Sequence, residues 1–111
     1  LKLKVSNERT FIAIKQRVQE DEGRLYKGCI KDLKVDNNIY ICYKKEQVLV
    51  KIINIRIFNN FEDILTFSDN SLSLTLPYCK NLEEGINLYK NIYKSKKIEE
   101  YGTVSIEIKV I

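Results

Sequence analysis

The sequence predicts an α+β fold: a small, mixed and mostly antiparallel β-sheet or barrel with helices packed on its outside. Its segments occur in the order strand, helix, several strands, two helices and strand, which lacks the strict alternation typical of parallel α/β folds. The chain has 111 residues, the usual length of one domain, so we expect residues 1–111 to form a single domain. Hydrophobic residues (44%) and charged residues (31%) are balanced in a way that excludes a disordered chain.

Residues 1–19 predict a strand followed by a helix. Apolar side chains alternate with lysines over residues 1–5, which is typical of a short, half-buried strand. Ser6 or Asn7 can cap the helix, and we expect it to end near Gln19. The apolar stripe of this helix has the spacing i, i+3, i+7 and consists of Phe11, Ile14 and Val18.

The middle of the chain predicts a β-hairpin. Residues 34–38 have the composition of a turn, and residues 39–43 and 47–58 have the β-branched and aromatic content of strands. The longer strand is apolar on both faces, which predicts burial on both sides or a bulge near residues 51–53 where the sheet curls. Simple alternation places Val48, Val50 and Ile52 on one face, and on the other Leu49, Ile53, Ile55 and Ile57.

The pattern after residue 58 predicts two helices and a final strand. Asn59 or Asn60 can cap a short helix over residues 61–65, and Asn81 can cap a longer one. Residues 68–76 combine loop-like residues with alternating leucines and favour no single element. Residues 94–97 have the composition of a solvated loop. The final strand, with one wet face, is expected over residues 104–110.

The composition excludes several chemistries. Histidine is absent, which excludes Ser-His-Asp and Cys-His catalysis as well as HExxH zinc sites. Glycine patterns that cradle phosphates are also missing. Cys29, Cys42 and Cys79 lie far apart without a CxxC pair, so we expect buried free thiols in a reducing, cytoplasmic compartment. We expect no metal and no cofactor.

The sequence gives no sign of a membrane partner. Its apolar runs are far shorter than the roughly 20 residues of a membrane span, and no signal-peptide pattern is found at the start. The numbering begins at Leu1 rather than Met, which leaves room for a missing initiator residue or short tag.

Positive charge is concentrated in the first half of the chain. The net charge is +4; residues 1–60 carry 13 Lys and Arg against 7 Asp and Glu, whereas residues 61–111 carry 6 against 8. Such an asymmetry favours an anionic partner, although an ordinary solvated surface accounts for it as well.

Ile14–Leu25, which reads IKQRVQEDEGRL, resembles the signature I-K-x-G-x-K-T-x-E-G-R-L of the ASCH domain family, a branch of the PUA-like superfamily. Residues 32–41, 50–65, 77–93 and 101–108 resemble further segments of that family in the same order. The resemblance spans essentially the whole chain and implies a PUA-like β-barrel with helices on its outside.

Some small ASCH-type proteins resemble amidohydrolases that act on acetylated cytidine through a lysine, a threonine and a glutamate. In this chain the lysine position falls on Gln19, and Arg17 replaces the glycine of the signature. Glu20 stands at the threonine of the printed signature, and the position of the threonine nucleophile, at the final E of the signature, falls on Glu22. The catalytic set is therefore not matched, and the resemblance does not carry the activity over.

What matches is Glu22-Gly23-Arg24, and the resemblance implies that these residues line a cleft between the first helix and the barrel. Arg24 offers a planar fork of donors to a phosphate or a base edge, and Glu22 can orient Arg24 or accept from an exocyclic amine. Alternatively, the two form a structural ion pair that holds the helix on the barrel. The predicted nucleic-acid-binding residues are Lys15, Arg17, Glu22, Arg24, Tyr26, Lys27 and Lys31.

Our leading hypothesis is a non-enzymatic RNA-binding, or single-stranded nucleic-acid-binding, module. One alternative is an amidohydrolase for a modified nucleoside such as N4-acetylcytidine, with Lys15 or Lys27 replacing the missing lysine. A second alternative is a small protein-interaction domain. The patterns that contain Tyr40, Tyr43, Tyr89 and Tyr93 favour packing rather than a stacking platform for bases.

Overall fold

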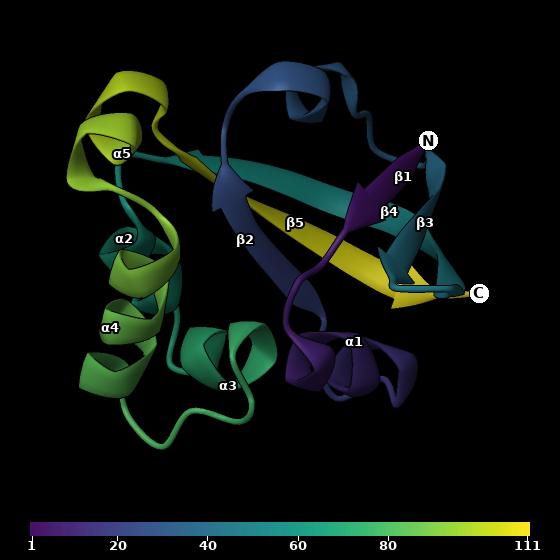
Figure 1. Cartoon of the computed structure of the whole chain (residues 1–111), viewed down its shortest axis with the longest axis horizontal. Coiled ribbons are helices and arrows are strands. Elements are labelled where there is room, and N and C mark those ends of the chain that lie inside the picture. The colour runs from purple at the N-terminus through teal and green to yellow at the C-terminus, as the bar shows by residue number, and fades with distance from the viewer.

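A five-stranded sheet that curls into a half-barrel forms the centre of the molecule (Figure 1). The computed structural model describes residues 1–111. The strands are β1 (Lys2–Lys4), β2 (Asp21–Leu25), β3 (Asn38–Tyr43), β4 (Glu46–Phe58) and β5 (Thr103–Val110), in the spatial order β1-β3-β4-β5-β2. The pairing of β1 with β3 is parallel and the other three pairings are antiparallel. The predicted α+β class with a mixed, mostly antiparallel sheet is confirmed, and β1 and β2 are its edge strands.

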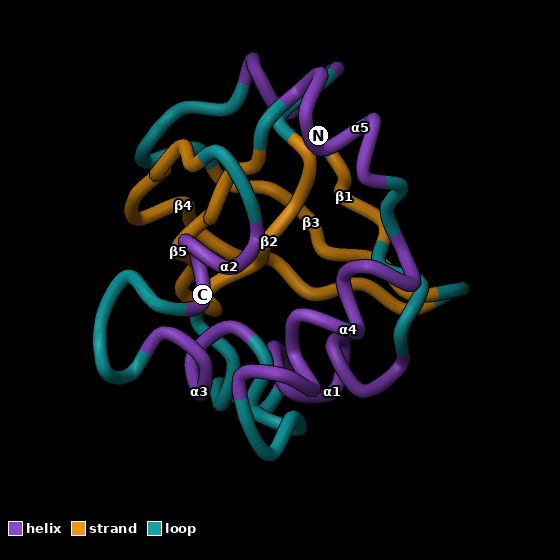
Figure 2. Tube along the Cα trace, turned by 90° about the vertical axis from the view of Figure 1, so that its left-hand side faces the viewer, coloured by secondary structure: helices purple, strands orange, loops and turns teal.

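Helices surround this sheet. They are α1 (Glu8–Lys15), the 3-10 helix η1 (Gly28–Asp32), α2 (Phe61–Leu65), α3 (Ser71–Thr75), α4 (Leu82–Ile92) and α5 (Ser95–Tyr101). Helices α2, α4 and α5 gather beside one end of the sheet, at the left of Figure 1, and α1, α3 and α4 lie along one side of the strands in Figure 2. None of them combines the length and apolar character that crossing a membrane would require.

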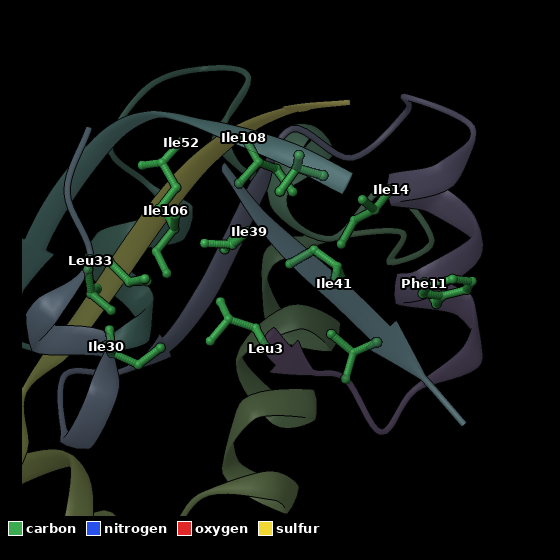
Figure 3. Packing of buried hydrophobic residues seen from close by; sticks show 13 residues of the cluster. Leu3, Phe11, Ile14, Ile30, Leu33, Ile39, Ile41, Ile52, Ile106 and Ile108 are labelled. Atoms are coloured by element: carbon green, nitrogen blue, oxygen red, sulfur yellow. The ribbon is translucent and has the colours of Figure 1, made fainter. Parts of the chain in front are cut away.

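The inner face of the sheet carries the larger hydrophobic core. Strand residues such as Ile39, Ile52 and Ile106 are almost fully buried and converge there (Figure 3). Phe11 of α1 packs at one end of this core and Ile30 of η1 at the other. The fully alternating strand pattern of β5 therefore reflects one apolar face turned inward.

A second, smaller core lies between the outer face of β2 and helices α2 and α4. It contains Leu25, Phe61, Ile64, Leu65, Leu76 and Tyr89. The rings of Phe61 and Tyr89 are stacked, with centroids 4.0 Å apart and planes inclined by 11°. Strand β2 is thus buried on both faces, which places its alternating side chains in two different environments.

The predicted bulge in β4 is confirmed, but it changes the faces of the residues that follow it. The register of β4 against β5 shifts between Ile52 and Asn54. After the shift Ile55 and Ile57 pair with Ile106 and Val104 of β5, on the same side of the sheet as Ile52. Ile55 packs against the inner core, whereas Ile57 lies beyond it and is exposed. Placing Ile55 and Ile57 on the opposite face was wrong, because the extra residue reverses the alternation.

One predicted helix end and one predicted loop are wrong, and the structure decides one segment that the sequence left open. Helix α1 ends at Lys15 rather than near Gln19, because Arg17 adopts a left-handed conformation with φ of 65°. The undecided segment over residues 68–76 contains helix α3. The predicted loop over residues 94–97 is wrong, because α5 begins at Ser95, and Ile98 of this helix packs against the smaller core. The cysteines are free, as predicted, but they are not buried: Cys29 is exposed and the other two are half-buried.

Candidate functional site

A pocket lies where the two edge strands, β1 and β2, approach each other beside α1 and α4. We call it the seam pocket, and its polar lining residues are Lys4, Ser6, Asn7, Thr10, Glu22, Arg24, Tyr78, Tyr89 and Tyr93. Its volume is about 80 Å³, well below the roughly 300–1,000 Å³ of pockets for drug-sized ligands. The seam pocket therefore suits one small group or the edge of a planar ring rather than a whole nucleotide.

Glu22 and Arg24 form one wall of the seam pocket. They are two positions apart on β2, so their side chains project to the same face. Nη2 of Arg24 lies 3.4 Å from Oε2 of Glu22 and also donates a hydrogen bond to the main-chain carbonyl of Lys4. The ion pair anticipated from the sequence is present within β2, and the hydrogen bond from Arg24 to Lys4 links β2 to β1 rather than to the first helix.

Burial and the neighbouring Arg24 together set the pKa of the Glu22 carboxyl. The Glu22 side chain is 11% exposed and that of Arg24 is 19% exposed. Removal from water raises the pKa of the Glu22 carboxyl, while the positive charge and hydrogen bond of Arg24 act in the opposite direction. Glu22 is therefore a carboxyl whose charge depends on its single cationic neighbour.

Tyr89 of α4 brings a hydroxyl to the other side of the seam pocket. Tyr89 is 4% exposed, and its hydroxyl has no hydrogen-bond partner. Burial, and then the Glu22 carboxylate, raise the pKa of this phenol well above its usual value, so it keeps its proton. The close approach of Tyr89 requires glycine at position 23, because a Cβ there would lie 2.5 Å from the hydroxyl oxygen.

The outer rim of the seam pocket is built from α1 and the segment before α4. The Tyr78 hydroxyl lies 2.7 Å from Oγ1 of Thr10, and the guanidinium of Arg9 sits 4.4 Å from the centre of the Tyr78 ring. Asn7 caps α1 by accepting from the main-chain N–H of Arg9. The rim is thus fixed by contacts between residues that are far apart in the sequence.

Two donors in the seam pocket lack acceptors. The buried Nε–H of Arg24 has no partner, like the hydroxyl of Tyr89. Buried polar groups in folded proteins are nearly always hydrogen-bonded, so two unpaired donors beside one carboxylate indicate a place where a ligand or water completes the bonding. The set offers donors from Arg24 and Tyr89 and an acceptor from Glu22.

Only two of the seven predicted site residues, Glu22 and Arg24, line the seam pocket. Lys15, at the end of α1, lies 3.5 Å from Glu46 on the surface. Arg17 borders a different groove, together with Lys109.

The other three predicted site residues follow β2 and also lie outside the seam pocket. The ammonium of Lys31 lies 5.3 Å from the centre of the Tyr26 ring, and that of Lys27 lies 5.2 Å from the Tyr101 ring. Tyr26 packs against the inner core. The predicted basic residues are therefore spread over different parts of the surface and do not converge on one cleft.

The sequence reasoning missed several lining residues. Tyr89 and Tyr93 were assigned to packing; they do stack on Phe61, yet they also line the seam pocket. Their i, i+4 spacing on one helix face was the available signal. Lys4 and Tyr78 carried no local signal, because only the tertiary fold brings them to Arg24 and Thr10.

Comparison with known proteins gives matches among solved structures only. No family model matches the chain, and no curated protein matches it. The crystal structure of hypothetical protein PH0355 is similar over 100% of both chains, with 28% sequence identity and a TM-score of 0.84. The solution structure of protein PF0455 from Pyrococcus furiosus is similar over 100% of this chain and 98% of that one, with 30% identity and a TM-score of 0.77. At this identity over its full length, the chain belongs to the same protein family as PF0455 from Pyrococcus furiosus.

Proposed function

We propose that this protein is a binding module for RNA or single-stranded nucleic acid and that the seam pocket receives the edge of an unpaired base. One observation carries the proposal: two buried donors without partners, Arg24 Nε–H and the Tyr89 hydroxyl, lie in the same small pocket as the Glu22 carboxyl.

The chemistry of the seam pocket matches that of a base edge. A base presents ring nitrogens and carbonyl oxygens as acceptors and exocyclic amines as donors. Arg24 and Tyr89 would donate to the acceptors, and Glu22 would accept from an amine. Because base pairing occupies the same edge, the module would select unpaired bases in loops, bulges or ends.

The rim of the seam pocket supplies contacts for the backbone that follows such a base. Lys4 is exposed and lines the pocket, and Arg9 lies over the Tyr78 ring beside it. The first turn of α1 also starts here and presents main-chain N–H groups, which favour phosphate. Lys15, Arg17, Lys27 and Lys31 would then add long-range attraction rather than direct contacts.

A titration with a fluorescent single-stranded RNA, measured at two salt concentrations, tests the proposal. We expect binding at low salt that weakens steeply as salt rises, because phosphate contacts release counterions. Tyr89→Phe removes only one hydroxyl and should lower affinity roughly tenfold, in line with about 1.4 kcal/mol for a lost hydrogen bond. Lys15→Gln, whose side chain lies away from the pocket, is the matched control and should change affinity only slightly. Absence of binding at low salt, or wild-type affinity of Tyr89→Phe, would contradict the proposal.

A hydrolase for a modified nucleoside is favoured by one observation, the raised pKa of the Glu22 carboxyl, which suits a general base. The lysine that lines the seam pocket is Lys4, not Lys15 or Lys27. Incubation with N4-acetylcytidine followed by chromatography separates the two functions. If the wild type releases cytidine and Glu22→Gln does not, the protein is an enzyme. If the substrate stays unchanged, the hydrolase is ruled out and the binding function is favoured.

A further inference from the structure

A second cavity lies on the side of β2 opposite to Glu22 and Arg24. Its volume is about 140 Å³, and Asp21 of β2, Glu107 of β5 and Arg56 of β4 line its floor. Asp21 and Glu107 are register partners, so their side chains share one face of the sheet. Helix α3 and the loop before it cover the cavity with Ser68 and Ser71. We call it the Asp21 cavity.

The Asp21 cavity holds more negative than positive charge. Three acidic residues, Glu20, Asp21 and Glu107, line the cavity together with one basic residue, Arg56. That guanidinium already donates to Oε1 of Glu107 at 3.0 Å. Neither Asp21 nor Glu20 forms an ion pair, although the Arg56 charge is close enough to act on Asp21.

One buried acceptor without a donor lies in the Asp21 cavity, and a second lies beside it. Asp21 is 9% exposed, and its Oδ1 has no hydrogen-bond partner. Gln19, which is 2% exposed, has an equally unpaired Oε1 and borders the adjoining groove together with Glu20 and Glu107. An ionised carboxylate and an amide oxygen accept hydrogen bonds, so the missing component is a donor, and the local excess of negative charge favours a cation.

We propose that the Asp21 cavity binds the primary ammonium group of a small alkylamine, with Oδ1 of Asp21 as its principal acceptor. An ammonium carries three N–H donors, which can bind the unpaired acceptor, and one positive charge, which offsets the excess of negative charge. A metal ion fits the site less well, because its acidic side chains are not close enough together to coordinate one. The hydroxyls of Ser68 and Ser71 provide further acceptors on the opposite wall. This site does not depend on the proposed nucleic-acid function, because neither Glu22 nor Arg24 borders it.

The site should release its ligand in acid. Burial raises the pKa of Asp21 to about 6; Glu107 adds to the rise, Arg56 opposes it, and Glu20 makes a smaller addition. Because only the ionised carboxylate attracts an ammonium, affinity should fall about tenfold between pH 7.5 and pH 5.

An NMR titration of ¹⁵N-labelled protein with methylammonium chloride at pH 7.5 tests the inference. We expect saturable shifts of the amides of Asp21, Ser71 and Glu107 with a dissociation constant in the millimolar range, since the ligand is so small. Tetramethylammonium has the same charge and no N–H donor, and it should bind at least about tenfold more weakly. Asp21→Asn should abolish the shifts, and Glu99→Gln, an exposed acid on α5, should leave them unchanged.

Two results would overturn the inference. One is equal binding of methylammonium and tetramethylammonium, which would reduce the cavity to a negatively charged surface. The other is an affinity of the wild-type protein that does not change between pH 7.5 and pH 5, a measurement that needs no variant to fold.

Discussion

Arg24 on β2 donates a hydrogen bond to the main-chain carbonyl of Lys4 on β1, and this contact spans the gap between the two edge strands of the half-barrel. The same guanidinium neutralises Glu22, so one side chain both closes the seam and compensates a buried carboxylate. Stability and binding at the seam pocket therefore depend on a common residue.

Arg24→Ala should destabilise the protein by roughly 2–4 kcal/mol, because it opens the seam and leaves Glu22 buried without its partner. Urea denaturation at pH 7 measures the change. Adding Glu22→Gln to Arg24→Ala should restore part of the loss, since a neutral amide costs less to bury than a lone carboxylate. A double variant as unstable as the single one would show that the ion pair is not the source of the effect.

Gly23→Ala should destabilise the protein by about 1–3 kcal/mol through overpacking against Tyr89. The new Cβ would lie 2.5 Å from the hydroxyl oxygen but 3.2 Å from the ring carbon that carries it. Tyr89→Phe should therefore rescue much of the loss in the double variant, and alone it should leave stability unchanged or slightly higher, because the hydroxyl is buried without a partner. Thermal unfolding of the four proteins gives the coupling between the two sites. Additive effects would mean that Gly23 is required for another reason.

Asp21 should make the protein less stable as pH rises from about 4 to about 6. Its carboxyl has an ordinary pKa of 3.8 and a folded-state pKa of about 6. Between these values the folded protein holds a proton that the unfolded chain has lost, so stability falls with rising pH and levels off above about pH 6. The difference between these two pKa values corresponds to about 3 kcal/mol at most.

Asp21→Asn isolates this contribution, because the amide does not titrate. The free energy of unfolding of the variant, relative to that of the wild type, should rise steadily between pH 4 and pH 6. Above pH 6 the difference should stay constant. Urea unfolding midpoints at pH 4, 5, 6 and 8 measure the difference. A wild-type-to-variant difference that is the same at every pH would place the pKa of Asp21 near its ordinary value.

Local chemistry explains which parts of the fold were predictable from the sequence. Asn60 and Asn81 cap α2 and α4 as expected, because the capping interaction lies within three residues of the chain. Helices α3 and α5, 5 and 7 residues long, have no side-chain cap, so their stability comes from tertiary packing rather than from a local signal. Their existence could not be derived from pattern alone.

The candidate site shows the same limit. Glu22 and Arg24 were found because their segment resembles a known signature, whereas strand β2, which carries both, was not predicted from the sequence. The predicted basic neighbours Lys15 and Lys27 are close to Glu22 and Arg24 in the sequence, but neither lines the seam pocket. They lie on opposite sides of β2 along the chain, and a strand advances about 3.3 Å per residue. Tyr78 is 68 residues from Thr10, and no local pattern encodes that contact.

Arg17→Gly should stabilise the protein by about 1 kcal/mol. Arg17 follows the end of α1 with a φ of 65°, a conformation that costs an L-residue roughly 1–2 kcal/mol and that glycine adopts freely. The main-chain N–H groups of Val18 and Gln19 both donate to the carbonyl of Ala13, so the turn that requires this conformation is held in place. Gln16→Gly is the matched control: Gln16 has a φ of −82°, so glycine there gains nothing and should destabilise the protein through its greater freedom in the unfolded state. Urea denaturation should therefore give opposite signs for two neighbouring glycine substitutions, and a loss of stability in Arg17→Gly would mean that the arginine side chain contributes more than its backbone conformation costs.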